Sequence, residues 1–401
     1  MGLVSCRGTC HSGGVRLSRR VADDPMNALS IRRAELVAAG IELTDLSDTN
    51  PTRHGLFDVG LLNVLETHVA QASRYEPSPR GPWPARAALA ERFGGDPEDY
   101  WLTASTSEAY GWLFAMLGDS GDAVAVPRPG YPLIEPLARL SGLSVRGYRT
   151  FYVHPSGWEV DIDSLREVLS DGRVRAVVAV HPNNPTGAYV DETVAEVAAE
   201  YEVPLIADEV FYPFYLGDSV PPPRLSGVGE SVRFGLDGLS KRLGAPQMKL
   251  GWIRLSGAAS YTESCERALD VIADTYLSVN TPIALALPDL LCHADRSVSL
   301  ITTRLKENLD HARQVFGENR VRTTYGGWMM LLDIPASMDA DTMCIQLMER
   351  AGLYVHPAYF YDLPDSTLAI SLLPKKEVFE EACQRLAAAQ YVFAHELLGD
   401  I

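Results

Sequence analysis

The sequence predicts an α/β protein in which helices sandwich a mostly parallel β-sheet, joined to a smaller α+β domain at the C-terminal end. The chain has 401 residues, of which 46% are hydrophobic, so it can fill more than one small core. From about Arg86 onward, helical patterns alternate with short β-branched runs, as they do in βαβ units. The runs Ala176–Val180 and Pro204–Ala207 are continuously apolar, which is typical of strands covered on both faces.

The elements of the large sheet are expected in a regular order along the chain. Short apolar runs predict strands at Ala123–Val126, Val174–Val180, Val203–Ala207, Val232–Leu236 and Leu250–Leu255. Helical periodicity between them predicts helices at Glu108–Leu117, Pro132–Leu140, Ile162–Leu169 and Thr193–Tyr201. The carboxyl ends of such strands meet at one edge of the sheet, where open α/β sheets bind their ligands.

Past about Leu285 the pattern changes to a compact α+β arrangement. The expected elements are a long helix at Ser297–Phe316, a strand at Met329–Ile334, a helix at Ala340–Ala351, a strand at Leu368–Leu372 and a final helix from Lys376. We therefore expect three units. Residues 1–45 form an N-terminal arm that folds onto the small domain, residues 46–285 form the large domain, and residues 286–401 form the small domain.

Charge and composition argue against several classes of function. The formal net charge is −17, whereas nucleic acids and anionic membranes need a basic partner surface. No apolar run reaches the roughly 18 residues of a membrane span, and no signal-peptide core precedes the pair Arg19-Arg20. The six cysteines are scattered, and Cys6 and Cys10 have no second pair of ligands, so we expect no metal site. Together these observations favour a cytoplasmic protein.

The segment Leu102–Ala109 follows an apolar run and opens a helix. Ser105, Thr106 and Ser107 stand at the start of that helix. Their hydroxyl groups, the free backbone N–H groups and the positive end of the helix dipole would bind an anion, most naturally a phosphate. The alternative is that these hydroxyl groups only cap the helix.

Three more segments follow predicted strands, and one polar side chain in each suggests a function. Asn184 lies in His181–Gly187, a turn that the surrounding prolines hold extended. Asp208 ends an apolar run, so its carboxylate needs a cationic or hydrogen-bonding partner. Lys241 follows Ser240, and a desolvated lysine amine becomes a nucleophile toward aldehydes. Taken singly, the three could be a simple turn, a structural ion pair and a surface lysine.

Taken together, the four segments resemble the class I and II aminotransferases, the fold-type I enzymes that use pyridoxal 5′-phosphate. The order, spacing and strand context match the phosphate cradle, Asn-Pro-Thr-Gly at 184–187, Asp-Glu-x-x-Tyr-like residues from 208, and Ser-Lys from 240. The resemblance runs from about Asp45 to the C-terminus. Its early part includes Ser47–Thr52 and the Tyr-x-Pro-x-x-x-Gly segment that begins at Tyr75.

The resemblance implies a role for each of four catalytic residues. Lys241 forms the internal aldimine and later moves the proton at the substrate's α-carbon. Asp208 keeps the pyridine nitrogen protonated, so that the ring can accept electrons. Asn184 hydrogen-bonds the ring oxygen O3′, and Tyr131 stacks on the face of the ring.

The resemblance also implies how the phosphate and the partner subunit are held. Further cofactor contacts are expected from Ser105, Thr106, Ser107, Ser240 and Lys249. Tyr75 is expected to reach the phosphate of the partner subunit, so that the active site is shared within a homodimer.

Four positions depart from the family pattern. Lys249 and Gly238 stand where arginine and serine are usual phosphate ligands, and Phe211 stands where many members have a tyrosine that bonds O3′. The largest departure is Ala369, which replaces the arginine that grips the substrate's α-carboxylate. A charge-assisted pair of that kind is worth about 1.5–3 kcal/mol. We therefore expect the substrate to be bound atypically.

The substrate site and the net reaction stay open. Asn50, Arg53 and Tyr212 are candidate substrate contacts, and Arg53 could replace the missing arginine. The leading interpretation is transamination of a small molecule. The alternative keeps the cofactor but performs elimination, replacement, carbon–carbon bond formation or oxidation. A non-catalytic regulator is disfavoured, because residues 1–45 are too short for a DNA-binding domain and because Lys241 and Asp208 are retained.

Overall fold

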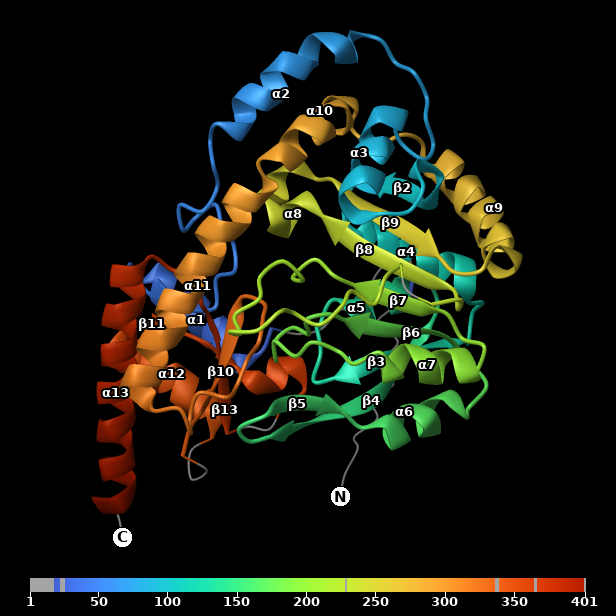
Figure 1. Ribbon diagram of the computed structural model, residues 1–401. Coiled ribbons are helices and arrows are strands. Elements are labelled where there is room, and N and C mark those ends of the chain that lie inside the picture. Colours follow the sequence, from blue (N-terminus) through green and yellow to red (C-terminus); the bar gives the residue numbers. More distant parts are fainter. Residues whose placement is uncertain (1–17, 22–25, 228, 336–338, 364–365, 400–401) are drawn as a thin grey trace, which may run out of the picture.

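The computed structural model describes residues 18–21, 26–227, 229–335, 339–363 and 366–399, and it is organised around an eight-stranded sheet (Figure 1). The strands lie in the order β2-β9-β8-β7-β6-β3-β4-β5. Their bounds are Tyr100–Thr103 (β2), Ala123–Arg128 (β3), Ser144–Val153 (β4), Gly157–Val160 (β5), Val174–Val180 (β6), Leu205–Asp208 (β7), Arg233–Gly238 (β8) and Gly251–Ser256 (β9). Six of the eight strands run parallel to one another, and β9 and β5 run antiparallel to them. The prediction of a mostly parallel sheet is confirmed.

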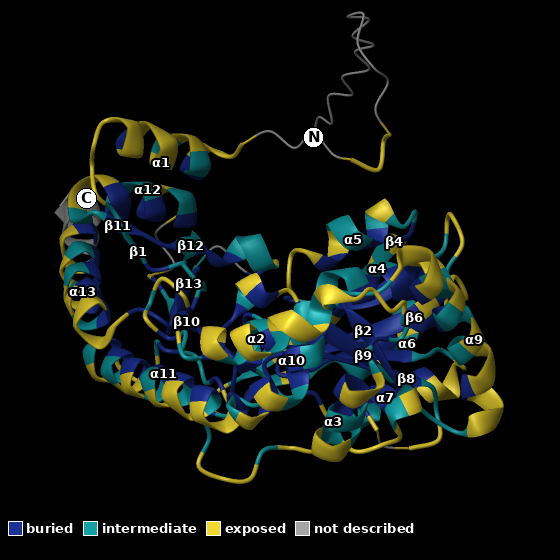
Figure 2. Cartoon of the chain, turned by 90° about the horizontal axis from the view of Figure 1, so that it is seen from above, coloured by how far each residue is buried: buried dark blue, intermediate teal, exposed yellow. Residues whose placement is uncertain are grey.

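Helices cover both faces of this sheet, as the apolar strands require. Along β6, Ala176 and Val178 pack in one cluster with α4, α5 and α9, whereas Val177 and Ala179 pack in another with α6 and α7. These helices span Thr106–Leu117 (α4), Ile134–Leu140 (α5), Ile162–Leu169 (α6), Thr193–Glu200 (α7) and Ala259–Tyr276 (α9). Figure 2 shows the strands buried between helices whose outer faces are exposed. The alternation of side chains along a strand thus fills two separate cores.

A further group of helices covers the β2–β9 end of the sheet. It comprises α2 (Leu61–Val69), α3 (Trp83–Phe93), α8 (Leu239–Arg242) and α10 (Thr281–Cys292), with the short 3₁₀ turns Ala70–Ser73, Pro97–Asp99 and Pro246–Met248 nearby. Leu89, Leu239 and Leu287 share a core there with Tyr100 and Trp252 of the sheet. This packing anchors α8, the helix that carries Lys241, against the end of the sheet.

The C-terminal part forms its own layer beside the large sheet. A small antiparallel sheet has the order β10-β13-β12, with bounds Met329–Asp333, Thr367–Ser371 and His356–Pro357. It is accompanied by α11 (Ala294–Phe316), α12 (Ala340–Ala351), α13 (Lys376–Gly399) and the 3₁₀ turn Ala358–Tyr361. The predicted C-terminal helices and strands therefore form, with ends shifted by at most three residues.

The first described elements lie against this C-terminal part. Helix α1 (Ala28–Ala38) packs on α12, and β1 (Thr44–Asp45) pairs in parallel with β11 (Leu353–Tyr354). The division of the chain at residues 45 and 285 stays a prediction. Cys6 and Cys10 lie outside the described residues.

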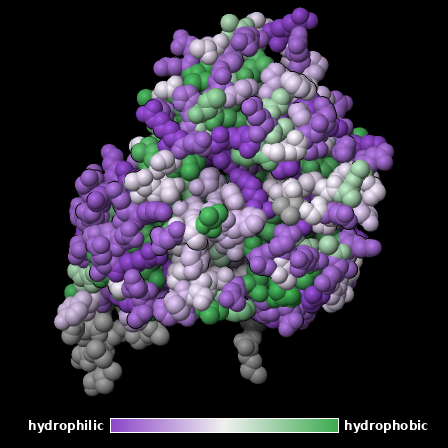
Figure 3. Space-filling view, viewed as in Figure 1, coloured by the Kyte–Doolittle hydropathy of each residue, from purple (hydrophilic) through white to green (hydrophobic). Residues whose placement is uncertain are grey.

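Two classes of feature are missing from the part of the chain that the structure describes. No helix there has the length and hydrophobicity needed to cross a lipid bilayer. Within the same residues, no group of three or more His, Cys, Asp or Glu side chains could hold a metal ion. On the face shown in Figure 3, hydrophilic side chains predominate and hydrophobic ones form separate patches.

Candidate active site

Four segments that the sequence singled out meet at the carboxyl edge of the large sheet. Asn184 follows β6, Asp208 ends β7, Lys241 follows β8 in α8, and α4 follows β2. Between them lies a cavity of about 110 Å³. The predicted site residues that line it are Thr106, Ser107, Tyr131, Asn184, Asp208, Ser240 and Lys241. Residues far apart in sequence are thus brought to one place.

Asp208 lies on the floor of this cavity and is 5% exposed. The hydroxyl group of Tyr110 donates a hydrogen bond to its Oδ2 at 3.0 Å, and the backbone N–H of Val210 donates to Oδ1 at 3.3 Å. Burial raises the pKa of Asp208 to about 6, and the bond from Tyr110 opposes that rise. No described cationic side chain forms an ion pair with this carboxylate, so a cationic ligand atom would stabilise it.

Lys241 is the only amine in the cavity wall formed by described residues. Its Nζ lies 4.8 Å from the ring centre of Trp328 and 5.3 Å from that of Phe211. Burial lowers the pKa of Lys241 to about 8, against the attraction of Asp208, which raises it. An amine with this pKa is partly neutral near pH 8, and the neutral form is the nucleophile.

Asn184 presents a buried amide oxygen, Oδ1, that has no partner among the described groups. The loop that carries it is held firmly. His181 accepts a hydrogen bond from the backbone N–H of Val190 at 2.9 Å, and its Nε2 lies 3.1 Å from the carbonyl oxygen of Pro223. Burial lowers the pKa of His181 to about 4, so this ring stays neutral and structural. The unpartnered amide of Asn184 is available for a ligand.

The N-terminus of α4 forms the other end of the cavity. Ser105 is the N-cap and accepts from the backbone N–H of Glu108 at 3.2 Å, which is the capping role that the sequence left open. Ser105 does not line the cavity, whereas Thr106 and Ser107 do. Gly251 packs so close that a Cβ atom there would lie 3.2 Å from the backbone nitrogen of Thr106. Free N–H groups and the helix dipole make this end suitable for an anion.

Besides Ser105, five predicted site residues do not line the cavity in this chain. Tyr75 is 64% exposed, and Lys249 is exposed with a left-handed backbone (φ 52°). Arg53 forms an ion pair with Asp48 at 3.2 Å. The side chain of Asn50 accepts hydrogen bonds from Thr52, and the hydroxyl group of Tyr212 donates to the carbonyl oxygen of Pro222. Their proposed roles stay predictions.

Sequence reasoning missed Tyr110 and Thr49 as cavity residues. Tyr110 lies four residues after Thr106 in the same helix, so helical periodicity could have placed both on one face. Thr49 precedes Asn50, which the sequence did single out. Trp328 both lines the cavity and packs in the C-terminal core.

Three buried charged residues and the partly buried Arg224 connect the segments next to Asp208 and Lys241. Glu209 pairs with Arg224 at 2.7 Å, Arg224 lies 3.6 Å from Asp237, and Asp237 also pairs with Arg242. Glu209 directly follows Asp208, and Arg242 directly follows Lys241. Because buried charges are costly unless paired, this network fixes the ends of β7 and β8 relative to each other.

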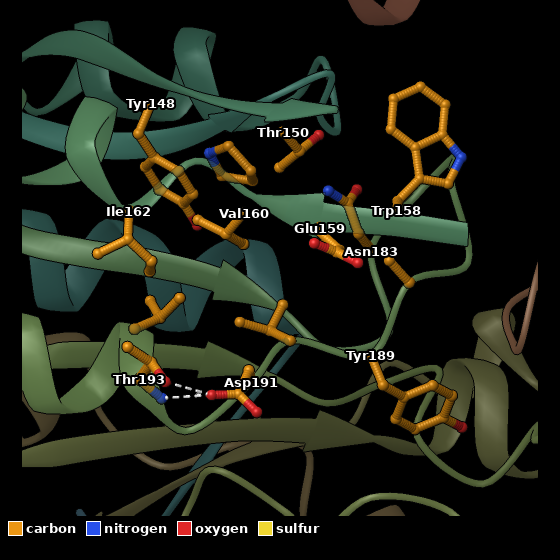
Figure 4. A pocket seen from close by; sticks show the side chains of 14 residues that line it. Tyr148, Thr150, Trp158, Glu159, Val160, Ile162, Asn183, Tyr189, Asp191 and Thr193 are labelled. Atoms are coloured by element: carbon orange, nitrogen blue, oxygen red, sulfur yellow. Dashed lines mark hydrogen bonds between the residues drawn. The ribbon is translucent and has the colours of Figure 1, made fainter. Parts of the chain in front are cut away.

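A larger cavity of about 410 Å³ is lined by Asn183, the residue that precedes Asn184 (Figure 4). Its walls come mainly from β4, β5 and the segment that follows β6, and they include Tyr148, Glu159 and Asn183. No lysine, arginine, histidine or cysteine lines it. The smaller cavity is therefore the candidate active site, because it alone of the two combines a buried amine with a buried carboxylate.

The side chains of the smaller cavity fit pyridoxal phosphate. The amine of Lys241 suits its aldehyde, and the buried carboxylate of Asp208 suits a protonated ring nitrogen. The amide nitrogen Nδ2 of Asn184 is a hydrogen-bond donor and suits the ring oxygen, and the N-terminus of α4 suits the phosphate.

Comparisons with known proteins agree with this fit. A model of the family "Aminotransferase class I and II" matches residues 67–386. The chain is 26% identical over 362 residues to a probable aminotransferase of Arabidopsis thaliana, TAT1, a match that covers 82% of this chain and 77% of that protein. It is 31% identical over 246 residues to the S-alkyl-thiohydroximate lyase SUR1 of the same plant. This match covers 57% of this chain and 51% of that protein. Several further curated relatives are matched over about half of their length.

Solved structures give the same result over nearly the whole chain. Alanine aminotransferase from Pyrococcus furiosus superposes with a TM-score of 0.83 at 25% identity, covering 94% of this chain and all of that one. An aminotransferase from Escherichia coli has the same TM-score at 22% identity, which supports the fold alone. The fold and the family model together show that the chain belongs to the class I and II aminotransferases and is a pyridoxal phosphate-dependent enzyme.

Proposed function

We propose that the chain transfers an amino group to or from a small molecule, with Lys241 as the residue that bonds the cofactor. Pyridoxal phosphate supplies an electron sink that stabilises negative charge on the substrate's amine-bearing carbon. Nζ of Lys241, once the substrate's amine has displaced it, takes the proton from that carbon and returns it. The lowered pKa of Lys241, about 8, suits an amine that must gain and lose a proton near neutral pH.

Asp208 holds the proton of the ring nitrogen in this proposal. Its burial favours a close cationic partner over solvent, and the hydrogen bonds from Tyr110 to Oδ2 at 3.0 Å and from the backbone of Val210 to Oδ1 at 3.3 Å hold the carboxylate in place. Asn184 bonds the ring oxygen, and Tyr131 covers one face of the ring and keeps water from it. Thr106 and Ser107, with Ser240, hold the phosphate at the start of α4.

The observation that carries the proposal is that the partly buried amine of Lys241 and the buried carboxylate of Asp208 line one cavity, each with a pKa shifted by burial. Replacement of Lys241 by alanine should abolish both the visible absorbance band of the bound cofactor and the activity. If the variant keeps both, the assignment of Lys241 is wrong. Retention of cofactor by the variant, measured after denaturation, separates loss of the bond from loss of binding.

The second candidate function is lyase or other non-transferring chemistry on the same cofactor. It is favoured by the likeness to S-alkyl-thiohydroximate lyase SUR1. A stoichiometric incubation with an amino donor distinguishes the two. A transaminase leaves the cofactor in its amine form until a keto acid or aldehyde is added, whereas a lyase restores the original absorbance by itself.

We further propose that the active site is completed by a second copy of the chain. Exposed hydrophobic side chains support this, because several lie on or next to α2, α3 and α10, which pack together, and grouped apolar side chains mark protein–protein contacts. They include Leu62, Val69, Tyr75, Trp83 and Leu277. Sedimentation of the holoenzyme should show a dimer, and a monomer that is fully active would contradict the proposal.

A further inference from the structure

The charges that line the active-site cavity are few. Among its lining residues, Lys241 is the one cation and Asp208 the one carboxylate. The proposed function uses both of them for the cofactor. Most of the remaining wall is aliphatic or aromatic and includes Leu137, Val210, Phe211, Trp328 and Met329. No guanidinium group is present in this wall to receive a substrate carboxylate.

The apolar wall continues beyond the cavity along one face of the C-terminal sheet. Met329 lines the cavity, and Met329 and Leu331 share a face of β10 because side chains alternate along a strand. Leu331 is paired with Ala369 of β13. Met329, Leu331 and Ala369 form one buried cluster with Ala358 and Leu363.

A second contact ties this cluster to the cavity. Tyr361 packs against the cluster, and its carbonyl oxygen accepts a hydrogen bond from the backbone N–H of Gly130 at 3.1 Å. Gly130 precedes Tyr131, which lines the cavity. The cluster that contains Ala369 is therefore joined to the active-site wall at two places, Met329 and the segment Gly130–Tyr131.

Two arginines in the adjoining strands and loops are already neutralised. Arg322 pairs with Asp333 at 2.8 Å and also donates to Thr367, two residues before Ala369 on β13. Arg128 pairs with Glu135 at 3.0 Å and with Asp362. A substrate carboxylate would have to compete with these bound carboxylates for either guanidinium group.

We propose that the substrate is a primary amine whose amine-bearing carbon carries no free carboxylate, and that an uncharged substituent lies against Met329, the cavity-lining member of the buried cluster that also contains Leu331 and Ala369. This inference rests on the proposed amino transfer. His356, which pairs with Ala369 across β12 and β13, has a pKa that burial lowers, so it supplies no positive charge near neutral pH. A carboxylate at this cluster would therefore lose its water without gaining a counter-charge, which is strongly unfavourable. An alcohol, amide or alkyl group avoids that cost.

The transfer balances in the usual way for this cofactor. The substrate gives its nitrogen to the cofactor and the proton of its carbon to Lys241, and water supplies the oxygen of the aldehyde or ketone that leaves. A second carbonyl compound, an aldehyde or a keto acid, accepts the nitrogen and restores the cofactor. No external oxidant or reductant is needed.

The test is a single-turnover measurement on the holoenzyme with amines matched in all but the carboxylate. The loss of the visible band is followed with L-phenylalanine, L-phenylalaninol and 2-phenylethylamine, and with L-alanine and L-alaninamide. We expect the compounds without a carboxylate to react at least about tenfold faster, a difference of 1.4 kcal/mol. If the free amino acids react as fast or faster, the inference is overturned while the proposed function stands. Absence of the visible band itself would instead refute the proposed function.

Ala369→Arg and Ala369→Met separate charge from size. We expect Ala369→Arg to raise the rate with L-phenylalanine relative to L-phenylalaninol by about tenfold or more, whereas Ala369→Met leaves that ratio within about twofold of the wild type. A folded Ala369→Arg protein with an unchanged ratio would refute the role of Ala369. If the arginine variant does not fold, Ala369→Met still decides the point. A lower rate with the three compounds that lack a carboxylate then supports contact between the substrate and this cluster. Unchanged rates with all five compounds contradict that contact.

Discussion

The hydroxyl group of Tyr110 donates a hydrogen bond to Oδ2 of Asp208 at 3.0 Å, with both groups buried beneath the active-site cavity. Tyr110 comes from α4 and Asp208 from the end of β7, so the bond joins the helix that we propose holds the phosphate to the strand whose last residue we propose faces the ring nitrogen. Burial raises the pKa of Asp208 and the hydrogen bond lowers it. Tyr110 is therefore a positioning residue that also keeps this carboxyl group ionised.

Tyr110→Phe should make cofactor binding more sensitive to acid. Without the hydrogen bond, the pKa of Asp208 in the cofactor-free protein rises above its value of about 6, so less carboxylate is present near pH 7. Since hydrogen bonds to charged groups contribute about 1.5–3 kcal/mol, we expect affinity for pyridoxal phosphate to fall about tenfold at pH 6.5. Fluorescence titration between pH 6 and 8 measures this.

Tyr148→Phe is the matched control for that variant. Tyr148 is equally buried, but its hydroxyl group donates to the carbonyl oxygen of Val178 at 2.8 Å. The control should lose about 1 kcal/mol of stability and keep the wild-type pH dependence of cofactor binding. Identical pH profiles for the Tyr110 and Tyr148 variants would show that the bond to Asp208 has no electrostatic role.

Lys241→Met should stabilise the cofactor-free protein at neutral pH. Burial lowers the pKa of Lys241 from 10.5 to about 8, so below pH 8 the folded state holds a charged amine at a cost, and this cost disappears as the pH rises toward 10.5. The variant should therefore be more stable at pH 7 by on the order of 3 kcal/mol, and the difference should shrink at high pH. Urea unfolding of both proteins at pH 7, 8.5 and 10 measures it, and a constant difference would contradict the buried charge.

The sequence predicted the buried parts of the fold better than its edges. The strands β3, β6, β7, β8 and β9 were predicted within two residues, because their continuous apolar runs reflect burial on both faces. β4 was missed, since its Arg146-Gly147-Tyr148-Arg149 segment is mostly exposed and its pairing with β5 forms an edge hairpin. Edge strands keep polar residues, so they lack the continuous apolar run by which the central strands of the sheet are recognised.

For the active site, sequence order predicted which side chains meet at the sheet edge but not how each is held. Asn184, Asp208 and Lys241 were found because they follow strands directly. The capping of α4 by Ser105 and the bond from Tyr110 depend on backbone geometry that spacing alone does not specify. Lys249 was expected at the phosphate, yet the left-handed turn at this residue leaves it exposed in the single chain.

Arg242→Met should destabilise the protein much more than loss of a surface ion pair. Arg242 pairs with Asp237, and both side chains are about 5% exposed or less. Removal of the arginine leaves the carboxylate of Asp237 buried with Arg224 as its nearest cation at 3.6 Å. We expect a loss of about 3–5 kcal/mol in urea unfolding of the holoenzyme.

Arg166→Met removes a surface ion pair and is the control for the loss of stability in Arg242→Met. Arg166 pairs with Glu200 on the surface, where both side chains are at least 40% exposed. Its removal should change stability by less than about 1 kcal/mol. Equal losses in the two variants would mean that the buried network does not hold β7 and β8 together.

Lys249→Gln tests whether this exposed lysine reaches a phosphate in the assembled enzyme. If it does, affinity for pyridoxal phosphate should fall about tenfold, as expected for one charge-assisted contact, while affinity for pyridoxal without the phosphate should not change. Equilibrium dialysis of both ligands against wild type and variant measures the two effects. Equal affinities of the wild type and the variant for pyridoxal phosphate would show that Lys249 does not contact the phosphate.

Gly251→Ala should weaken phosphate binding through the backbone alone. A Cβ atom at Gly251 would lie 3.2 Å from the backbone nitrogen of Thr106, the carbonyl carbon of Ser105 and the carbonyl oxygen of Asp237. The start of α4 must then shift by a few tenths of an ångström, away from the position in which its N–H groups face the cavity. We expect a tenfold or greater loss of affinity for pyridoxal phosphate, because hydrogen bonds to charged groups are worth about 1.5–3 kcal/mol each.

Gly111→Ala, in the same helix, is the control that makes this result interpretable. A Cβ atom at Gly111 would meet no atom within 4 Å, and alanine is the better helix former by about 1 kcal/mol. This variant should therefore be more stable than the wild type and bind the cofactor equally well. The pair separates crowding at the phosphate end of α4 from a general response of the helix to added side chains, since only the crowded position should affect the ligand. Unchanged affinity in Gly251→Ala would mean that the N-terminus of α4 does not hold the phosphate.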